Sequence, residues 1–271
     1  MTDKQGNLPA NWLERYSRNI LLPGVGGRGQ RRLLAARVAV VGLGGLGSPA
    51  ALYLAASGVG TLDLIDSDAV ELSNLQRQIL HGTPDLGRPK TASAGEALAR
   101  LNPGVHLNLH AERLDSGNAA ELLGKADVIL DGSDNFATRY LVNETAVRLG
   151  RPLVTASLFR FEGQAAVFLN AGGPEEPCYR CLFPVPPPAG ALPSCQEAGI
   201  LGSVAGLLGT IQATEALKLL LGIGEPLTGR VLGVDALSME FTTLRVRRNP
   251  ACPLHGAESS MLPPFHPSDS T

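Results

Sequence analysis

The stretch Arg37–Gly47 constrains the fold more than any other part of the chain. Four consecutive apolar residues, Val38–Val41, follow Arg37 without the polar alternation of a half-exposed strand. A strand covered on both faces is therefore predicted. A G-x-G-x-x-G turn with one additional glycine follows: Gly42, Gly44, Gly45 and Gly47. Pro49 suits the first turn of a helix. Strand, glycine-rich turn and helix together predict a nucleotide site, where backbone N–H groups and the helix N-terminus face a phosphate.

Strand-like and helix-like segments alternate after this turn. The predicted strands are Thr61–Ile65, Val105–Leu109, Ala126–Leu130 and Pro152–Ala156, and the predicted helices are Ala50–Ser57, Thr91–Leu101, Asn118–Leu123 and Ala137–Leu149. This order predicts an α/β fold with a doubly wound, mainly parallel, Rossmann-like sheet.

The pattern changes after residue 160. A strand-like segment, Gly163–Leu169, has no helix before it, and two more strands, Gly229–Val234 and Glu240–Arg245, follow a long helix near Gly202–Leu221. Strands without intervening helices predict an antiparallel extension of the sheet. We expect one domain over residues 1–258 and a disordered, proline- and serine-rich tail over 259–271.

Composition and charge exclude several classes of protein. A net charge of −2 and an aromatic content of 4% argue against nucleic-acid binding, which needs a basic excess and favours stacking side chains. The most apolar segment, Val204–Leu221, is interrupted by Gln212, Glu215 and Lys218, which predicts a buried helix rather than a membrane span. The polar N-terminus lacks a signal region, so we expect a cytoplasmic protein without a membrane partner.

Charged and polar residues follow the predicted strands at one edge of the sheet. Asp66 and Asp68 end the second strand, where a doubly wound fold places an acid against ribose hydroxyls; a solvated acidic turn is the alternative, above all for Asp68. Asn74, Arg77 and Lys90 suit a triphosphate, although a surface salt bridge is a common role for each of the two cations.

The segment Asp131–Asn135 follows the fourth strand. A carboxylate at this edge, opposite a polyphosphate, is well placed to bind Mg²⁺, and we assign this role to Asp134. The alternative is a helix N-cap formed by Asp134 or Ser133.

Two pairs of residues have the spacing of metal ligands. Cys178 and Cys181 form a C-x-x-C pair, and Cys252 and His255 form a C-x-x-H pair about 70 residues later. Three thiolates and one imidazole fit a closed zinc site, which would clamp the proline-rich loop after residue 172 to the C-terminal strands. The alternative is one C-x-x-C turn and an unrelated coincidence. Cys195 has no remaining partner and is either a nucleophile or an inert thiol.

These motifs, taken in order, resemble the ThiF/MoeB/HesA adenylyltransferases, the bacterial relatives of ubiquitin-activating enzymes. The resemblance covers about residues 12–256 and rests on the segments Arg15–Ile20, Gly42–Gly47, Asp66–Asp68, Leu72–Gln78, Arg88–Lys90, Asp131–Asn135 and Cys178–Cys181.

The resemblance implies ATP-dependent adenylation of the C-terminal Gly-Gly carboxylate of a small ubiquitin-like sulfur-carrier protein, with release of pyrophosphate. It implies nucleotide binding by the glycine turn, with Gly45 close to the nucleotide, and a nucleotide-binding half over about 1–157, followed by a carrier-binding and zinc half over about 158–258. It also implies site residues: Asp66 and Asp68 near the ribose, Ser73, Asn74, Arg77, Lys90 and Asn135 at the nucleotide, Asp134 at Mg²⁺, and Arg18 reaching the nucleotide of the partner subunit in a homodimer.

Two features depart from the family pattern. His255 stands where a cysteine is usual, and Cys195 matches a loop cysteine that forms a covalent link to the carrier only in some relatives. No rhodanese-like domain follows, so we expect a separate sulfur donor. The carrier, of molybdopterin or thiamine biosynthesis, stays open. Two alternatives remain: an NAD-dependent oxidoreductase, which needs only the glycine turn and Asp66, and a non-catalytic scaffold for a ubiquitin-like partner.

Overall fold

Strands buried on both faces form the centre of one eight-stranded sheet. The computed structural model describes residues 10–173, 175–188 and 199–255, and the strand order is β3-β2-β1-β4-β5-β6-β7-β8. The first five strands run parallel: β1 (Arg37–Val41), β2 (Thr61–Ile65), β3 (His106–His110), β4 (Val128–Asp131) and β5 (Leu153–Phe159). The predicted doubly wound sheet is confirmed, and its strand order reverses between β1 and β4.

The predicted antiparallel extension is also confirmed. Three further strands pair antiparallel in sequence order: β6 (Glu162–Phe168), β7 (Arg230–Asp235) and β8 (Glu240–Arg245). Direct neighbours along the chain, β5 and β6 need no crossover helix, whereas the long helix α10 lies between β6 and β7 in the sequence.

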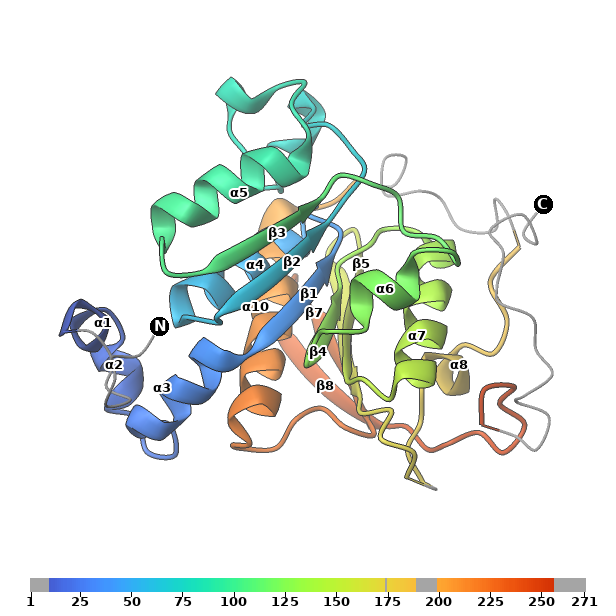
Figure 1. Ribbon diagram of the computed structural model, residues 1–271. Helices are drawn as coiled ribbons and strands as arrows, with labels where there is room; N and C mark the ends of the chain where they lie inside the picture. The colour runs from blue at the N-terminus through green and yellow to red at the C-terminus, as the bar shows by residue number, and fades with distance from the viewer. Residues whose placement is uncertain (1–9, 174, 189–198, 256–271) are drawn as a thin grey trace.

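Helices cover both faces of the sheet (Figure 1). One core contains apolar residues of α4 (Gly47–Ser57), α5 (Lys90–Leu101) and α10 (Gly202–Leu221), and α3 (Gly26–Ala35) packs beside α10. The opposite core contains residues of α6 (Ala119–Leu123), α7 (Phe136–Leu149) and the four-residue helix α8 (Tyr179–Leu182). Short 3₁₀ helices lie at Leu72–Asn74 and Thr83–Asp85.

Helix α10 is long and apolar enough to cross a membrane, but half of its apolar window is buried in this domain. Its two buried polar side chains have partners there: Gln212 Nε2 donates to the carbonyl of Asp131 at 2.7 Å, and Glu215 accepts from the amide of Leu227 at 2.7 Å. Buried polar side chains with backbone partners are typical of a core helix. The prediction of a buried helix is confirmed.

The N-terminal helices α1 (Ala10–Arg15) and α2 (Ser17–Ile20) have no counterpart among the predicted elements. Tyr16, between them, is 2% exposed, and its hydroxyl accepts from Asn102 Nδ2 at 2.8 Å. Asn102 ends α5 and also donates to the carbonyl of Ala55 near the end of α4. The N-terminal segment is thereby attached to the C-terminal ends of α4 and α5. These ends lie at the amino edge of the sheet, where the parallel strands begin. The predicted tail 259–271 lies outside the described residues.

Candidate functional site

The glycine turn joins β1 to α4 with almost no free space. Gly42 has a φ of +84°, in the left-handed region that favours glycine, and its amide donates to the carbonyl of Ile65 at 2.8 Å. A Cβ at Gly47 would overlap the carbonyl oxygen of Gly42. Gly132, after β4, would bring a Cβ within 3.0 Å of the Gly47 nitrogen. Only glycines permit this crossing of three backbone segments where the strand order reverses.

The two middle glycines differ in their surroundings. A Cβ at Gly45 would lie 3.1 Å from the Cβ of Ala205 on α10 and 3.4 Å from Arg77 Cγ, whereas at Gly44 the nearest atom would be Gln78 Nε2 at 3.7 Å. Close packing against α10 and Arg77 therefore explains why residue 45 is a glycine, independently of any bound nucleotide. Among the described residues, the amides of Gly44 and Gly45 donate to no acceptor, which leaves them available to an anion.

Asp66 attaches the end of β2 to the turn. One carboxylate oxygen accepts from the amide of Leu43 at 2.7 Å, and the other accepts from the amide of Asp68 at 2.8 Å. Lys90 Nζ lies 2.8 Å from Asp68 Oδ2 and 4.0 Å from Asp66 Oδ2. Burial raises the pKa of Asp66, while the Lys90 charge and both amides oppose the rise. The structure thus brings together Asp66, Asp68 and Lys90 at the carboxyl edge of the parallel strands, the predicted nucleotide edge. The salt bridge of Lys90 lies at this edge and not elsewhere on the surface.

The segment after β2 contributes Ser73, Asn74 and Arg77 to the same edge. Asn74 Nδ2 donates to Glu71 at 3.1 Å, and Asn74 Oδ1 accepts from Gln78 at 2.6 Å. Arg77 donates to the carbonyl of Ser73 at 3.1 Å and has no ion pair with any carboxylate of the described chain. The salt-bridge alternative for Arg77 is absent there, so its charge is available to a ligand.

Buried polar side chains form hydrogen bonds that fix the loop after β4. Asp131 is 1% exposed and accepts from the Ser133 amide at 3.0 Å and hydroxyl at 2.6 Å. Arg139 donates to the Ser133 carbonyl at 2.9 Å. Asp134, by contrast, is exposed and has no hydrogen bond or ion pair to any residue in the described ranges. The helix cap is neither predicted candidate: Asn135 caps α7, because its side chain accepts from the Thr138 amide at 2.9 Å.

Sequence reasoning missed the supports of this edge. Asp131 and Arg139 shape the loop, and His81, which fits no catalytic pattern in the sequence, contacts the Leu43 carbonyl with its Nε2 at 3.1 Å. Asp131 could have been found as the last residue of an apolar strand. Arg139 carries no recognisable signal because it contacts a backbone carbonyl, that of Ser133, and His81 carries none because Leu43 lies 38 residues away in the chain.

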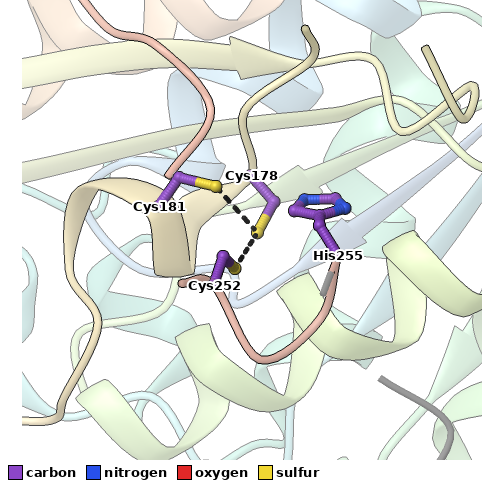
Figure 2. Close-up of side chains that lie close together, drawn as sticks. All are labelled: Cys178, Cys181, Cys252 and His255. Carbon is purple, nitrogen blue, oxygen red and sulfur yellow. Dashed lines mark hydrogen bonds between the residues drawn. The ribbon is translucent and has the colours of Figure 1, made fainter. Parts of the chain in front are cut away.

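The four predicted zinc ligands meet at one point (Figure 2). Their ligand atoms lie within 4.8 Å of one another, and the Sγ of Cys178 lies 4.0 Å from that of Cys181 and 3.8 Å from that of Cys252. A tetrahedral zinc site with Zn–S bonds of about 2.3 Å places its sulfurs roughly 3.8 Å apart. The predicted convergence of the two pairs is confirmed, and the alternative of an unrelated coincidence is wrong.

The chemistry of the cluster also fits zinc. Hydrogen bonds from the thiols of Cys178 and Cys252 lower the pKa of Cys181, which favours a thiolate there, whereas the pKa values of Cys178 and Cys252 are raised. Burial lowers the pKa of His255, which keeps the imidazole neutral, and its Nε2 is buried without a hydrogen-bond partner in the described structure. A thiolate and a neutral imidazole are the forms that ligate metals.

Helix α8, which carries Cys181, is attached to α7 by polar and aromatic contacts. The Tyr179 amide donates to Asn143 at 2.9 Å, and Arg180 forms an ion pair with Glu144 at 2.6 Å. The rings of Tyr140 and Tyr179 meet edge to face, 5.3 Å apart. Since α7 starts next to Asp134, the cysteine cluster and the nucleotide edge share this helix.

Two further predicted residues lie elsewhere. Arg18, on α2, is exposed without a partner in the described chain, and α2 follows Tyr16 at the amino edge of the sheet. Helix α4 extends from the glycine turn to this edge, and its 11 residues span about 16 Å. Arg18 therefore lies at the opposite edge of the sheet from the glycine turn. Cys195 lies outside the described residues.

Comparison with known proteins identifies the family. The model of the ThiF family matches residues 16–254. The chain belongs to the ThiF family. Its relatives include a sulfur carrier protein adenylyltransferase of Thermus thermophilus, 52% identical over 91% of this chain and 92% of that protein. A probable adenylyltransferase/sulfurtransferase, MoeZ of Mycobacterium tuberculosis, is 50% identical over 88% of this chain, which spans 61% of the length of MoeZ.

A solved structure supports the fold assignment. E. coli MccB, crystallised with ATP, matches 93% of this chain and 83% of its own with a TM-score of 0.74. The sequence identity is 23%, so this similarity is one of fold. The predicted family and fold class are confirmed.

Proposed function

We propose that this protein uses ATP and Mg²⁺ to adenylate the C-terminal Gly-Gly carboxylate of a small ubiquitin-like sulfur-carrier protein, with release of pyrophosphate. The observation that carries the proposal is the exposed carboxylate of Asp134, which has no partner among the described residues, at the edge that also holds the glycine turn, Arg77 and Lys90. The name of the Thermus relative, a sulfur carrier protein adenylyltransferase, supports the same reaction.

Each side chain has a role that its position supports. Asp66 binds the ribose with the lone pairs that its two backbone donors leave free, next to Asp68. Ser73, Asn74, Arg77 and Lys90 bind the phosphates, and Asn135 orients the loop by capping α7. Asp134 holds Mg²⁺, which neutralises phosphate charge when bound.

The reaction needs no general base, because the carboxylate of the carrier is itself the nucleophile. One of its oxygens attacks the α-phosphorus of ATP, and the bond to the bridging oxygen of pyrophosphate breaks. Catalysis then rests on in-line positioning and on the cations that stabilise charge in the transition state. Arg77 and Lys90 supply that charge from this chain, and Lys90 must exchange part of its contact with Asp68 for phosphate.

The position of Arg18 supports a homodimer with shared sites. Because its own turn lies at the opposite edge of the sheet, we propose that Arg18 reaches the nucleotide of the partner subunit. Mixing inactive Arg18→Ala with inactive Asp134→Ala subunits should restore part of the activity, since one composite site in each heterodimer is complete. No recovery despite demonstrated subunit exchange would refute the shared site.

We propose a structural role for the zinc site. Cys178, Cys181, Cys252 and His255 fill a tetrahedral set, so no ligand position remains for a substrate. The three cysteines form no disulfide, which suits the reducing cytoplasm. A separate protein would deliver the sulfur there.

Pyrophosphate exchange tests the reaction directly. The protein is incubated with ATP, Mg²⁺, labelled pyrophosphate and a panel of Gly-Gly carriers of molybdopterin and thiamine biosynthesis. Exchange with one carrier identifies the pathway, and no exchange with any carrier, under conditions where the Thermus relative is active, refutes the proposal. Tight NADH binding without ATP binding would favour an oxidoreductase instead. Full cellular function of Asp134→Ala would favour a scaffold.

Cys195 has a test of its own. If it forms an obligatory covalent link to the carrier, Cys195→Ser should abolish formation of the carrier thiocarboxylate in the presence of a sulfur donor. Unchanged thiocarboxylate formation would exclude that role while leaving adenylation intact.

A further inference from the structure

His81 is a buried histidine directly beneath the glycine turn. It is 7% exposed and lies between the two 3₁₀ helices that follow β2. Its Nε2 lies 3.1 Å from the carbonyl oxygen of Leu43 in the turn, and its Nδ1 lies 2.8 Å from Ser93 Oγ on α5. The imidazole thus links the turn to the helix whose first residue is Lys90.

The partners determine which nitrogen carries the proton. A backbone carbonyl only accepts, so the hydrogen bond to Leu43 requires a proton on Nε2. In the neutral ring Nδ1 then accepts from the Ser93 hydroxyl. Burial, helped by the Lys90 charge, lowers the pKa of His81, while the hydrogen bond to the Leu43 carbonyl and the charges of Asp66 and Asp85 oppose this shift, so the neutral form is favoured near pH 7. His81 is therefore a fixed donor to the turn.

This hydrogen bond fixes the orientation of one peptide unit. The Leu43 carbonyl accepts from His81 Nε2 and, at 3.2 Å, from the Ser48 hydroxyl, while the Leu43 amide donates to Asp66. No described peptide bond is cis, and in a trans peptide the C=O and N–H point in opposite directions. The amide of Gly44 consequently points away from His81 and Ser48, and it has no acceptor among the described residues.

We propose that His81 is a positioning residue for nucleotide binding: it holds the Leu43–Gly44 peptide so that the Gly44 amide donates to a phosphate of the nucleoside triphosphate. The same imidazole sets the distance between this amide and α5, which begins with Lys90. A preorganised donor needs no reorientation when the anion binds, and this lowers the cost of binding. The inference rests on the proposed function, because it assigns His81 to the same ATP site.

Two substitutions of similar chemistry separate positioning from packing. In His81→Gln the side-chain amide can occupy the position of Nε2 and donate to Leu43, whereas the shorter side chain of His81→Asn reaches only the position of Nδ1. Ser93→Ala removes the hydrogen bond to Nδ1 and keeps the one to Leu43, and His106→Asn, at an exposed position on β3, is a matched control. ATP dissociation constants, KM for ATP, kcat and melting temperatures are measured for all four and for the wild type.

We expect His81→Asn to bind ATP roughly tenfold more weakly, and His81→Gln to stay within about twofold of the wild type. Because the amide contacts phosphate before and during the reaction, KM for ATP should rise while kcat changes little. Ser93→Ala should weaken binding by about twofold, and His106→Asn should have no effect. A role in packing alone would reduce the folded fraction, and with it kcat, while KM stayed constant.

The outcomes distinguish this inference from the proposed function. If the wild type does not bind ATP, the proposed function fails. If the wild type binds ATP and folded His81→Asn binds it equally well, the role of His81 is refuted and the proposed function stands. Equal losses of affinity in His81→Asn and His81→Gln would also refute the positioning role, because only one of them lacks the donor.

Discussion

The nucleotide edge and the cysteine cluster gather polar side chains in opposite ways. At the nucleotide edge, the glycine turn, Arg77 and Asp134 have donors and acceptors with no partner among the described residues. In the cluster, four ligand atoms within 4.8 Å already face one another. The first arrangement suits ligands that bind and leave, and the second suits one ion that stays. We therefore expect substitutions at the nucleotide edge to affect activity and substitutions in the cysteine cluster to affect stability.

The largest effect is expected from the open carboxylate. Asp134→Ala should reduce the rate of adenylation roughly 1,000-fold, because the metal that neutralises phosphate charge loses its ligand. Stability should change by less than about 0.5 kcal/mol, because the side chain is exposed and contacts no polar partner in the part of the chain that the structure describes. Pyrophosphate exchange and thermal unfolding measure the two effects. Asp134→Asn, which keeps the shape, should be nearly as inactive; wild-type activity in either variant would contradict the assignment.

The next effect concerns the backbone at the same edge. Gly47→Ala should destabilise the fold by about 3 kcal/mol, because its Cβ would overlap the Gly42 carbonyl. Gly44→Ala is the matched control, since its Cβ has ordinary contacts and should leave the fold intact. Urea unfolding compares the two variants. Equal stability of the two variants would contradict the prediction, because it would mean that the turn can shift to accommodate a Cβ at residue 47.

The closed cluster should affect stability rather than chemistry. Cys252→Ala should remove bound zinc and lower the free energy of unfolding by about 2 kcal/mol, because the ion no longer links α8 to the segment after β8. His255→Cys supplies a fourth thiolate and should keep the metal. Elemental analysis and melting temperatures test both. A wild type without zinc, unaffected by chelators, would overturn the site.

The smallest effect lies in the helix shared by the two regions. Tyr140→Phe should cost about 1 kcal/mol, because the Tyr140 hydroxyl donates to the Phe183 carbonyl at 2.9 Å. Burial raises the pKa of Tyr140 from 10.0 to about 12. Its contribution is thus complete below pH 10 and is lost as the pH rises through about 12, because the unfolded chain releases the proton first. Urea unfolding at rising pH should show a larger loss in the wild type than in Tyr140→Phe, which keeps only the smaller loss expected from Tyr179, whose pKa burial also raises.

Much of the nucleotide edge was predictable, because its residues follow their strands directly. Asp66 follows β2 and Asp134 follows β4, and parallel strands bring such positions together at one edge. The helix cap was not predictable, since Ser133, Asp134 and Asn135 are all good caps and only the backbone at residue 135 decides among them. His81 was missed because its partners, Leu43 and Ser93, form no local pattern with it.

The sequence by itself determined the alternation of strands and helices, the glycine turn and the two ligand pairs, because these depend on neighbouring residues and short spacings. Only the tertiary structure decided that Gly45 packs against α10, that Arg18 lies at the far edge from its own turn, and that Cys178 meets Cys252. Each of these depends on contacts between segments that are distant in the chain, and such contacts cannot be deduced from neighbouring residues or short spacings.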